Sequence, residues 1–408
     1  MKYIIVISDG MGDYPIESLN NRTPLEAANV PNMDYLAQNG EIGMAKTTSD
    51  GLSPGSDVTN LAILGYDPER YYTGRSPFEA ASMGVSLHHG DISYRCNLVT
   101  LRDIENGYNF EQITSKVIMD DYSAGHITSE DAKVIIREIN NQLGTEHIQF
   151  YSGISYRHLM VWTGGKISKD LTPPHDISGK KVIDYLSGGN GGDIIRELIE
   201  SSIPILQTSP INRDRIEAGK SPANSIWLWG EGKRPNLPEF RGRYGLSCSM
   251  ISAVDLMKGI GIYAGLDIIN VPGATGYLDT NYRGKGEYGL EELKKKDMIY
   301  IHIEAPDEAG HNGDIAAKVK AIESIDDLVL GTILNGVENI DDEYKIMILC
   351  DHRTPIVKKT HTDDPVPFLI YNSLNKEKSS GKDFNEKNAE TGLFIEKGYR
   401  LMEYFTRR

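Results

Sequence analysis

Six side chains in four short segments are carboxylates or imidazoles, the groups that bind divalent metal ions: Asp9, Asp307, His311, Asp351, His352 and His361. Asp307 and His311 are four residues apart, which places both on one face of a helix. Asp351 and His352 follow an apolar run, and at a strand end both can project into one crevice. Carboxylate and imidazole ligands suit Mn, Zn or Co, whereas cages of oxygen alone suit Mg or Ca. Two such ions side by side would clamp a phosphoryl group during in-line displacement.

A serine at the start of a predicted helix supplies the nucleophile that phosphoryl transfer needs. In the segment Gly51–Ala62, a Pro-Gly turn leads into Ser56, and Asp57 follows in the first helical turn. The amino terminus of a helix offers free N–H groups and a positive dipole to phosphate oxygens. A neighbouring metal ion would lower the pKa of the hydroxyl, so we predict Ser56 as the nucleophile.

Each of these segments has a simpler explanation when it is taken alone. Asp9, which follows a strand, can cap the next helix, and Ser56 can be an ordinary N-cap. Asp307 and His311 can form a plain salt bridge, and His361 in its polar loop carries no information by itself. The metal site is favoured because all these residues occur together in one chain.

Short apolar runs alternate with helical patterns and predict the frame that holds these residues. Strands are expected at Tyr3–Ile7, Met298–Ile303, Lys345–Cys350 and Pro367–Tyr371, and a helix at Asp314–Leu330. Strands that alternate with helices predict an α/β fold with a mostly parallel sheet covered on both faces. Ligands of such sheets bind beyond the carboxyl ends of the strands, where Asp9 and Asp351 are expected.

The middle of the chain contains none of the metal-type clusters and is predicted to be a second, smaller α/β domain inserted into the first. We place this insert at residues 86–239 and the catalytic domain at residues 1–85 and 240–408. The insert has its own predicted strands, at Ser93–Leu101, His147–Tyr151, His158–Thr163 and Ser225–Trp229, and its own predicted helices, at Ser129–Gln142 and Asp193–Ser201.

Composition excludes several classes of protein. A chain of 408 residues with a net charge of −15 has no basic footprint for nucleic acid, and a phosphate site in it needs locally concentrated positive charge. Three widely separated cysteines imply no disulfide framework, and none accompanies the ligands as in a structural zinc site.

The first apolar run is too short for a signal peptide, and no stretch approaches the roughly 18 apolar residues of a membrane span. We expect a cytoplasmic protein without nucleic-acid or membrane partners.

The ligand motifs occur in the order typical of the alkaline phosphatase superfamily, which the chain resembles: SDGMGD, PGSDVTNLAILGYDP, APDEAGHNGD, CDHRTP and THTDDPVPF. More narrowly, nearly the whole chain resembles the archaeal-type cofactor-independent phosphoglycerate mutases. Three longer strings belong to that family's pattern and not to the superfamily at large: PANSIWLWGEG, ISAVDLMKGIGIYAG and VPGATGYLDTNY.

The resemblance implies an isomerase that interconverts 2-phosphoglycerate and 3-phosphoglycerate through a phosphoserine, without 2,3-bisphosphoglycerate. It implies an alkaline-phosphatase-like core and two divalent ions, Mn as the first choice, then Zn or Co, with Mg as a further candidate. The implied ligands of one ion are Asp9, Ser56, Asp351 and His352, and those of the other are Asp307, His311 and His361.

The family also implies that the inserted domain binds the glycerate, whose carboxylate requires cationic groups. The substrate-binding candidates are His126, Arg157, His158 and His175, with Lys258 on the side of the core. Asp176 is the candidate base that activates the glycerate hydroxyl for the return of the phosphoryl group.

Three classes of alternative function can be weighed from the residues alone. A metal-dependent phosphohydrolase or a phosphopentomutase would use the same metal core with a different insert. A nucleotide-dependent kinase is disfavoured, because the tripeptide Gly219-Lys220-Ser221 has Asp214 where a phosphate loop needs glycine. A metal-stabilised binding protein would have no use for a serine among the ligands.

Overall fold

The structure is a computed structural model that describes residues 1–104, 113, 115–168, 171–186, 188–189, 191–340, 343–374 and 379–407. It divides into two compact units: unit 1 comprises Met1–Tyr72 and Asn236–Arg408, and unit 2 comprises Thr73–Pro235. Unit 2 begins earlier than residue 86, where the sequence placed the boundary. The reason is helix α5 (Ser76–Ser82), which packs against three strands of unit 2.

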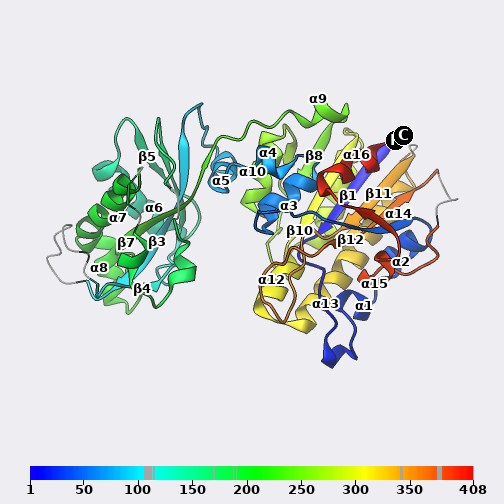
Figure 1. The fold of residues 1–408 in the computed structure, drawn as a ribbon, viewed down its shortest axis with the longest axis horizontal. Coiled ribbons are helices and arrows are strands. Elements are labelled where there is room, and N and C mark those ends of the chain that lie inside the picture. The colour runs from blue at the N-terminus through cyan, green and yellow to red at the C-terminus, as the bar shows by residue number, and fades with distance from the viewer. Residues whose placement is uncertain are drawn as a thin grey trace. The chain divides into compact units, whose positions relative to one another are not determined.

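Within the described residues, unit 1 is built on an eight-stranded sheet in the order β13-β2-β12-β11-β1-β10-β8-β9 (Figure 1). The strands are β1 (Lys2–Ser8), β2 (Glu41–Ala45), β8 (Cys248–Ile251), β9 (Asp267–Ile269), β10 (Met298–Ile303), β11 (Tyr344–Leu349), β12 (Val366–Asn372) and β13 (Leu393–Ile395). The five strands from β11 to β9 are mutually parallel, and only β12 runs antiparallel to its neighbours. The prediction of a mostly parallel α/β sheet is confirmed.

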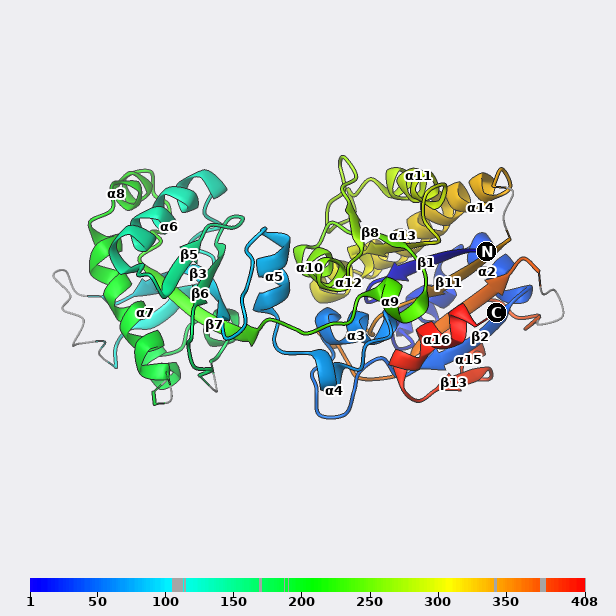
Figure 2. The ribbon, with the colours of Figure 1, turned by 90° about the horizontal axis from the view of Figure 1, so that it is seen from above.

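Helices cover both faces of this sheet, as a parallel sheet requires. On one face Tyr3 packs edge-on against Phe405 of α16 (Leu401–Thr406), with ring centroids 5.5 Å apart. On the other face α11 (Tyr282–Leu293) approaches so closely that a Cβ on Gly289 would lie 2.9 Å from the Ile301 side chain. Figure 2 shows α11, α13 and α14 on one side of the strands of unit 1 and α16 on the other.

The remaining helices of unit 1 lie in the connections between these strands. The α-helices are α1 (Pro24–Ala27), α2 (Pro31–Gln38), α3 (Ser56–Ile63), α4 (Pro68–Tyr71), α9 (Phe240–Tyr244), α10 (Asp255–Tyr263), α12 (Ala305–Asn312), α13 (Ile315–Ser324), α14 (Gly331–Val337) and α15 (Glu386–Ala389). Two short 3₁₀ turns, η1 (Glu17–Leu19) and η6 (Gly398–Arg400), and a π-helical turn, η5 (Ile325–Leu330), complete the unit.

Sheet order brings the ligand-bearing segments together at one edge. The central strands β11, β1 and β10 are adjacent and parallel, so their carboxyl ends meet on the same side. Asp9 follows β1, Asp351 follows β11, and helix α12 with Asp307 follows β10. This edge is where an α/β sheet of this kind binds its ligands.

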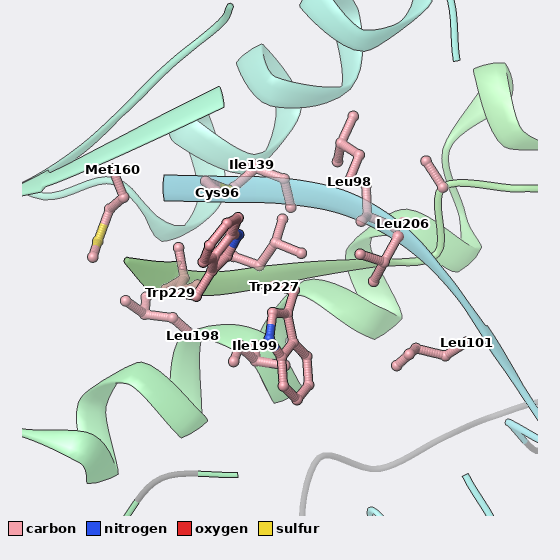
Figure 3. Close-up of a cluster of buried hydrophobic side chains, with 14 of the residues drawn as sticks. Cys96, Leu98, Leu101, Ile139, Met160, Leu198, Ile199, Leu206, Trp227 and Trp229 are labelled. Carbon is pink, nitrogen blue, oxygen red and sulfur yellow. The ribbon is translucent and has the colours of Figure 1, made fainter. Parts of the chain in front are cut away.

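Unit 2 is built on an antiparallel sheet in the order β4-β3-β6-β5, with β7 also paired to β3. Its elements are β3 (Ile92–Arg102), β4 (Ile118–Asp121), β5 (Ile148–Tyr151), β6 (Arg157–Trp162), β7 (Ser225–Lys233), α6 (Ser129–Leu143), α7 (Gly192–Gln207), α8 (Pro210–Glu217), η3 (Pro174–Ile177) and η4 (Val182–Tyr185). Its core lies between sheet and helices, where Trp227 sits beside Leu198 and Ile199 of α7 (Figure 3). The Trp227 indole N–H donates to the Thr172 carbonyl at 2.9 Å, so this buried polar atom has a partner.

None of the helices in the described ranges combines the length and apolar character that a membrane crossing demands.

Candidate metal centre and active site

The first ligand group joins the ends of β1 and β11 with the start of α3. Asp9, Asp351 and His352 lie at most 1% exposed, and each offers a ligand atom within 4.8 Å of the others. His352 Nε2 lies 3.4 Å from Asp9 Oδ1 and 3.5 Å from Asp351 Oδ2. The Ser56 hydroxyl lies 3.1 Å from the same Nε2, at the first residue of α3. The structure therefore brings the predicted nucleophile to the predicted ligands.

Helix α3 also fixes the orientation of Asp351. Asn60, one turn after Ser56, donates to Asp351 Oδ2 at 2.8 Å and accepts a hydrogen bond from the Tyr300 hydroxyl at 2.6 Å. The other carboxylate oxygen accepts from the backbone N–H of Gly10 at 3.2 Å. Sequence reasoning missed Asn60, although its spacing of four residues from Ser56 places both on one helical face.

The second ligand group consists of Asp307, His311 and His361. The two carboxylate oxygens of Asp307 face the two imidazoles: Oδ2 lies 3.3 Å from His311 Nε2, and Oδ1 lies 3.4 Å from His361 Nε2. The two Nε2 atoms are 2.9 Å apart. His311 Nδ1 lies 3.0 Å from the Lys359 carbonyl, which can only accept, so Nδ1 carries a proton and Nε2 is the nitrogen that faces Asp307.

The two groups are neighbours. The rings of His352 and His361 stack with centroids 3.8 Å apart, which links the first group to the second. Gly10 permits this proximity, because a Cβ at that position would lie 2.7 Å from the Cα of Asp307. Gly10 also has a φ of +61°, a conformation that glycine adopts without strain.

The electrostatics of the two groups match a site for cations. Burial, followed by the charges of Asp351 and Asp307, raises the pKa of Asp9 well above its usual range. Burial acts in the same direction on Asp307, but hydrogen bonds from His311 and His361 outweigh it and hold the pKa well below the usual range. The hydrogen bond to Asp307 in turn raises the pKa of His311 to about 9. Three carboxylates so close together are stable when positive charge lies between them.

The residues present fit divalent metal ions. Asp9 Oδ1 is buried without a hydrogen-bond partner in the described part of the chain, and such an orphaned oxygen is what a cation would satisfy. The donors are carboxylates and imidazoles with a hydroxyl beside them, a set suited to Mn, Zn or Co. In each group, three ligand atoms lie within 4.8 Å of one another.

In unit 2, three of the predicted substrate residues lie along one row of aromatic rings. His126 packs edge-on against Tyr156, Arg157 lies over the same ring at 5.5 Å, and His175 packs against Tyr122 and Trp229. His126, Arg157 and His175 are all exposed. They form one surface that presents the guanidinium group of Arg157, two imidazoles and ring edges.

A further arginine of this surface was missed by sequence reasoning. Arg95 on β3 stacks on Trp229 at 4.0 Å and is held by Glu79, whose Oε2 accepts from its Nε at 2.9 Å. It lies within electrostatic reach of His175 and Arg157. Arg95 on β3 lies opposite Trp229 on β7 in the antiparallel register. The sequence alone does not show which strands are neighbours, so it did not reveal this contact.

The other predicted residues of the substrate site are placed differently. His158 is 3% exposed in the core of unit 2, and its Nδ1 accepts the Gly153 N–H at 3.0 Å, so it is a structural residue and the prediction of a substrate contact is not retained. Asp176 is exposed, 3.7 Å from His175. Lys258 lies in unit 1, on α10, paired with Asp255 at 3.6 Å, and α10 packs against α3.

The fold and the site together define an α/β enzyme with an Asp/His centre for divalent metal ions and a serine beside it. Comparison with known proteins specifies the family. A family profile described as 2,3-bisphosphoglycerate-independent phosphoglycerate mutase matches residues 37–212. A mutase of that name from Methanosarcina barkeri is 50% identical over 393 residues, 96% of each chain.

Two solved structures are similar over nearly the whole length. One, from Pyrococcus horikoshii, has a TM-score of 0.80 at 29% identity and covers 99% of this chain and 96% of its own. The cofactor-independent phosphoglycerate mutase of Thermoplasma acidophilum has a TM-score of 0.66 at 25% identity, with 99% of each chain covered. The chain belongs to the family of 2,3-bisphosphoglycerate-independent phosphoglycerate mutases, which confirms the predicted family, mutase function and isomerase class.

Proposed function

We propose that the chain interconverts 2-phosphoglycerate and 3-phosphoglycerate through a phosphoserine at Ser56, with two divalent ions held by the two ligand groups. The observation that carries this proposal is the distance of 3.1 Å between Ser56 Oγ and His352 Nε2, within a buried group that also contains Asp9 and Asp351. One ion belongs to Asp9, Ser56, Asp351 and His352, and the other to Asp307, His311 and His361. Manganese is the first choice for both.

The proposed reaction has two half-steps in which the phosphoryl group changes oxygen. In the first, a bond forms between Ser56 Oγ and phosphorus, the hydroxyl proton leaves, and the bond from phosphorus to the glycerate oxygen breaks. That oxygen takes up a proton. In the second half-step Asp176 takes the proton of the other glycerate hydroxyl, that oxygen bonds to phosphorus, the bond from phosphorus to Ser56 Oγ breaks, and Ser56 regains its proton. When bound, the ions supply positive charge that stabilises the phosphoryl oxygens and lowers the pKa of the attacking hydroxyl.

Unit 1 is the catalytic domain in this proposal and unit 2 binds the glycerate. His126, Arg157 and His175 are the groups of unit 2 that meet the carboxylate, and Arg95 joins them as a further cation of the same surface. Lys258 is the substrate contact of unit 1. Free, buried cysteines at positions 96, 248 and 350 fit the reducing cytoplasm in which we place the enzyme.

The test is turnover of 3-phosphoglycerate by protein stripped with a chelator and reloaded separately with Mn, Zn, Co or Mg. The assay is coupled through enolase and contains no 2,3-bisphosphoglycerate. We expect chelator-sensitive formation of 2-phosphoglycerate, fastest with Mn. Release of inorganic phosphate without isomerisation would move the function to hydrolysis on the same centre. Equal turnover of the stripped and reloaded proteins would contradict the metal-dependent mechanism.

A further inference from the structure

We propose that Thr354 is a positioning residue that couples the two ligand groups, because its one hydroxyl fixes both Asp307 and His352. This inference rests on the proposed two-metal function and assigns a role to a residue that is not itself a ligand. Thr354 follows β11 by five residues and is completely buried.

The hydroxyl of Thr354 lies between one residue of each group. Its Oγ1 donates to Asp307 Oδ1, in the second group. The same oxygen lies 3.2 Å from His352 Nδ1, in the first group. Few side chains could make both contacts, because a hydroxyl carries one proton to donate and lone pairs with which to accept.

This arrangement selects one tautomer of His352. The carboxylate of Asp307 can only accept, so the single hydroxyl proton of Thr354 is committed to it. A lone pair of Oγ1 therefore faces His352 Nδ1, and the contact is attractive only if Nδ1 carries the ring proton. The lone pair of His352 is then at Nε2, the atom that lies 3.1 Å from Ser56 Oγ and 3.4 Å from Asp9. A fixed tautomer of this kind is what orients a histidine ligand toward a metal ion.

The backbone of Thr354 is held as firmly as its side chain. Its N–H donates to the Gly12 carbonyl at 3.2 Å, which ties it to the loop after β1. Its carbonyl accepts from Lys318 Nζ at 2.8 Å, and the same ammonium group forms an ion pair with Asp13 at 2.7 Å. The backbone that carries the hydroxyl is therefore held by the loop after β1 and by Lys318 of α13.

Packing leaves no freedom for Thr354 to move away. A Cβ on Gly10 would lie 2.6 Å from its Oγ1, and a Cβ on Gly310 would lie 2.5 Å from its carbonyl oxygen. Because Gly10 and Gly310 have no side chain, Thr354 fits between the loop after β1 and helix α12. Valine has nearly the same shape, so Thr354→Val removes the hydroxyl with little change in volume, and Thr354→Ser keeps the hydroxyl.

The experiment measures manganese binding to chelator-stripped protein by titration calorimetry. The wild type is expected to bind two ions per chain. Thr354→Val is expected to lose about 10- to 100-fold in affinity for the ions, as is usual when a partner of a metal ligand is removed. Thr354→Ser is expected to restore most of that affinity. Thr332→Val is the control, because it removes a hydroxyl of α14 that donates to the Leu328 carbonyl of the preceding turn and to no ligand residue.

A second readout separates positioning from plain structural support. The visible absorption spectrum of the cobalt-loaded protein reports coordination geometry, and we expect Thr354→Val to change it while Thr332→Val does not. If Thr354→Val does not fold, Thr354→Ala takes its place under the same criteria. Two ions bound with wild-type affinity and an unchanged cobalt spectrum would overturn the inference. A wild type that binds no ions or isomerises no phosphoglycerate would instead refute the proposed function.

Discussion

Unit 1 and unit 2 present their polar groups in opposite ways. In unit 1 the two carboxylates and the imidazole of the first ligand group are at most 1% exposed, at the ends of parallel strands. In unit 2, His126, Arg157 and His175 are exposed and rest on aromatic rings beside an antiparallel sheet. Buried carboxylates repel one another and are stable only with cations and fixed hydrogen bonds. Exposed cations on rings remain hydrated until an anionic ligand arrives from solvent.

The difference follows from the two kinds of sheet. A parallel sheet is covered by helices on both faces, so its polar residues gather in the connections at one edge. In unit 1 that gathering brings together segments that are about 300 residues apart in sequence, such as Asp9 and Asp307. In unit 2 exposed polar residues lie in the connections outside the antiparallel sheet, such as His126 before α6 and His175 in the 3₁₀ turn η3. The comparison predicts that substitutions in unit 1 affect chemistry and folding most, and those in unit 2 affect ligand binding.

The largest expected effect is that of Ser56→Ala in unit 1. Loss of the nucleophile should lower kcat for isomerisation by about 10⁴-fold, since the phosphoserine cannot form. Manganese binding should change little, because the Asp and His ligands remain. The measurement is the enolase-coupled rate alongside metal content, with Ser53→Ala as the control, an exposed serine in the same turn. An undiminished kcat for Ser56→Ala would exclude the phosphoserine mechanism.

The next largest effect is expected for the buried ion pair of Lys318 and Asp13. Lys318→Met leaves an uncompensated carboxylate in a fully buried place, at a cost of about 3–5 kcal/mol in the free energy of unfolding. Urea unfolding of the metal-free protein, followed by far-UV circular dichroism, measures it. Lys320→Met on the same helix is the control, with an expected cost of about 0–1 kcal/mol. The Lys320 side chain is 71% exposed, and its ion pair with Glu323 is long, at 3.9 Å. Equal losses for the two variants would refute the claim that burial gives Lys318 its importance.

The central strands of the fold could be predicted from the sequence because they are buried on both faces. The run Met298–Ile303 coincides with β10, and the run from Tyr3 lies within β1. The short strands β2 and β13, at one end of the sheet, could not be found in this way, since they lack a long apolar run. The predicted helix Asp314–Leu330 is interrupted by the π-helical turn η5, where Asp326 turns to accept the Met33 N–H at 2.7 Å. Met33 lies on α2, so the sequence of the predicted helix alone could not reveal this contact.

In the candidate site, too, some features could be predicted from the sequence and others depend on contacts across the fold. Residue types and motif order predicted the candidate ligands, but sheet order was needed to show that the segments after β11, β1 and β10 meet. Thr354 carried no signal, because its role depends on two contacts across the fold. The burial of His158 could have been foreseen: neighbouring residues on a strand face opposite ways, so Arg157 and His158 could not both point to solvent.

The interior of unit 2 is predicted to make its stability depend on pH. Burial lowers the pKa of His158 to about 3, from an ordinary value of 6.5. The folded state therefore favours the neutral ring, and this stabilisation is complete above pH 6.5 and declines as the pH falls toward 3. At pH 4.5 the loss amounts to about 2–3 kcal/mol relative to pH 7. His158→Gln keeps an acceptor for the Gly153 N–H but does not titrate, so the pH dependence should become flatter.

Tryptophan fluorescence measures this effect in the intact chain. All three tryptophans, Trp162, Trp227 and Trp229, lie in unit 2, so their signal follows the unfolding of that unit alone. The control is His147→Gln in the same unit, an exposed histidine whose side chain is 64% accessible. It should leave the pH dependence unchanged. Identical curves for the wild type and His158→Gln would show that the buried imidazole does not govern the acid sensitivity of unit 2.

The smallest effect is expected on the exposed surface of unit 2, and it concerns binding more than chemistry. Arg157→Ala should lower kcat/KM for phosphoglycerate by about 10- to 100-fold, the worth of one charge-assisted hydrogen bond to a carboxylate. Most of the change should appear in KM, because Arg157 is far less buried than the ligands and is not assigned to the phosphoryl group. Manganese affinity should remain that of the wild type. Arg137→Ala, an exposed arginine on α6 of the same unit, should change neither parameter. If Arg157→Ala lowers kcat as severely as Ser56→Ala while KM stays constant, then the division of labour between a buried catalytic centre and an exposed binding surface is wrong.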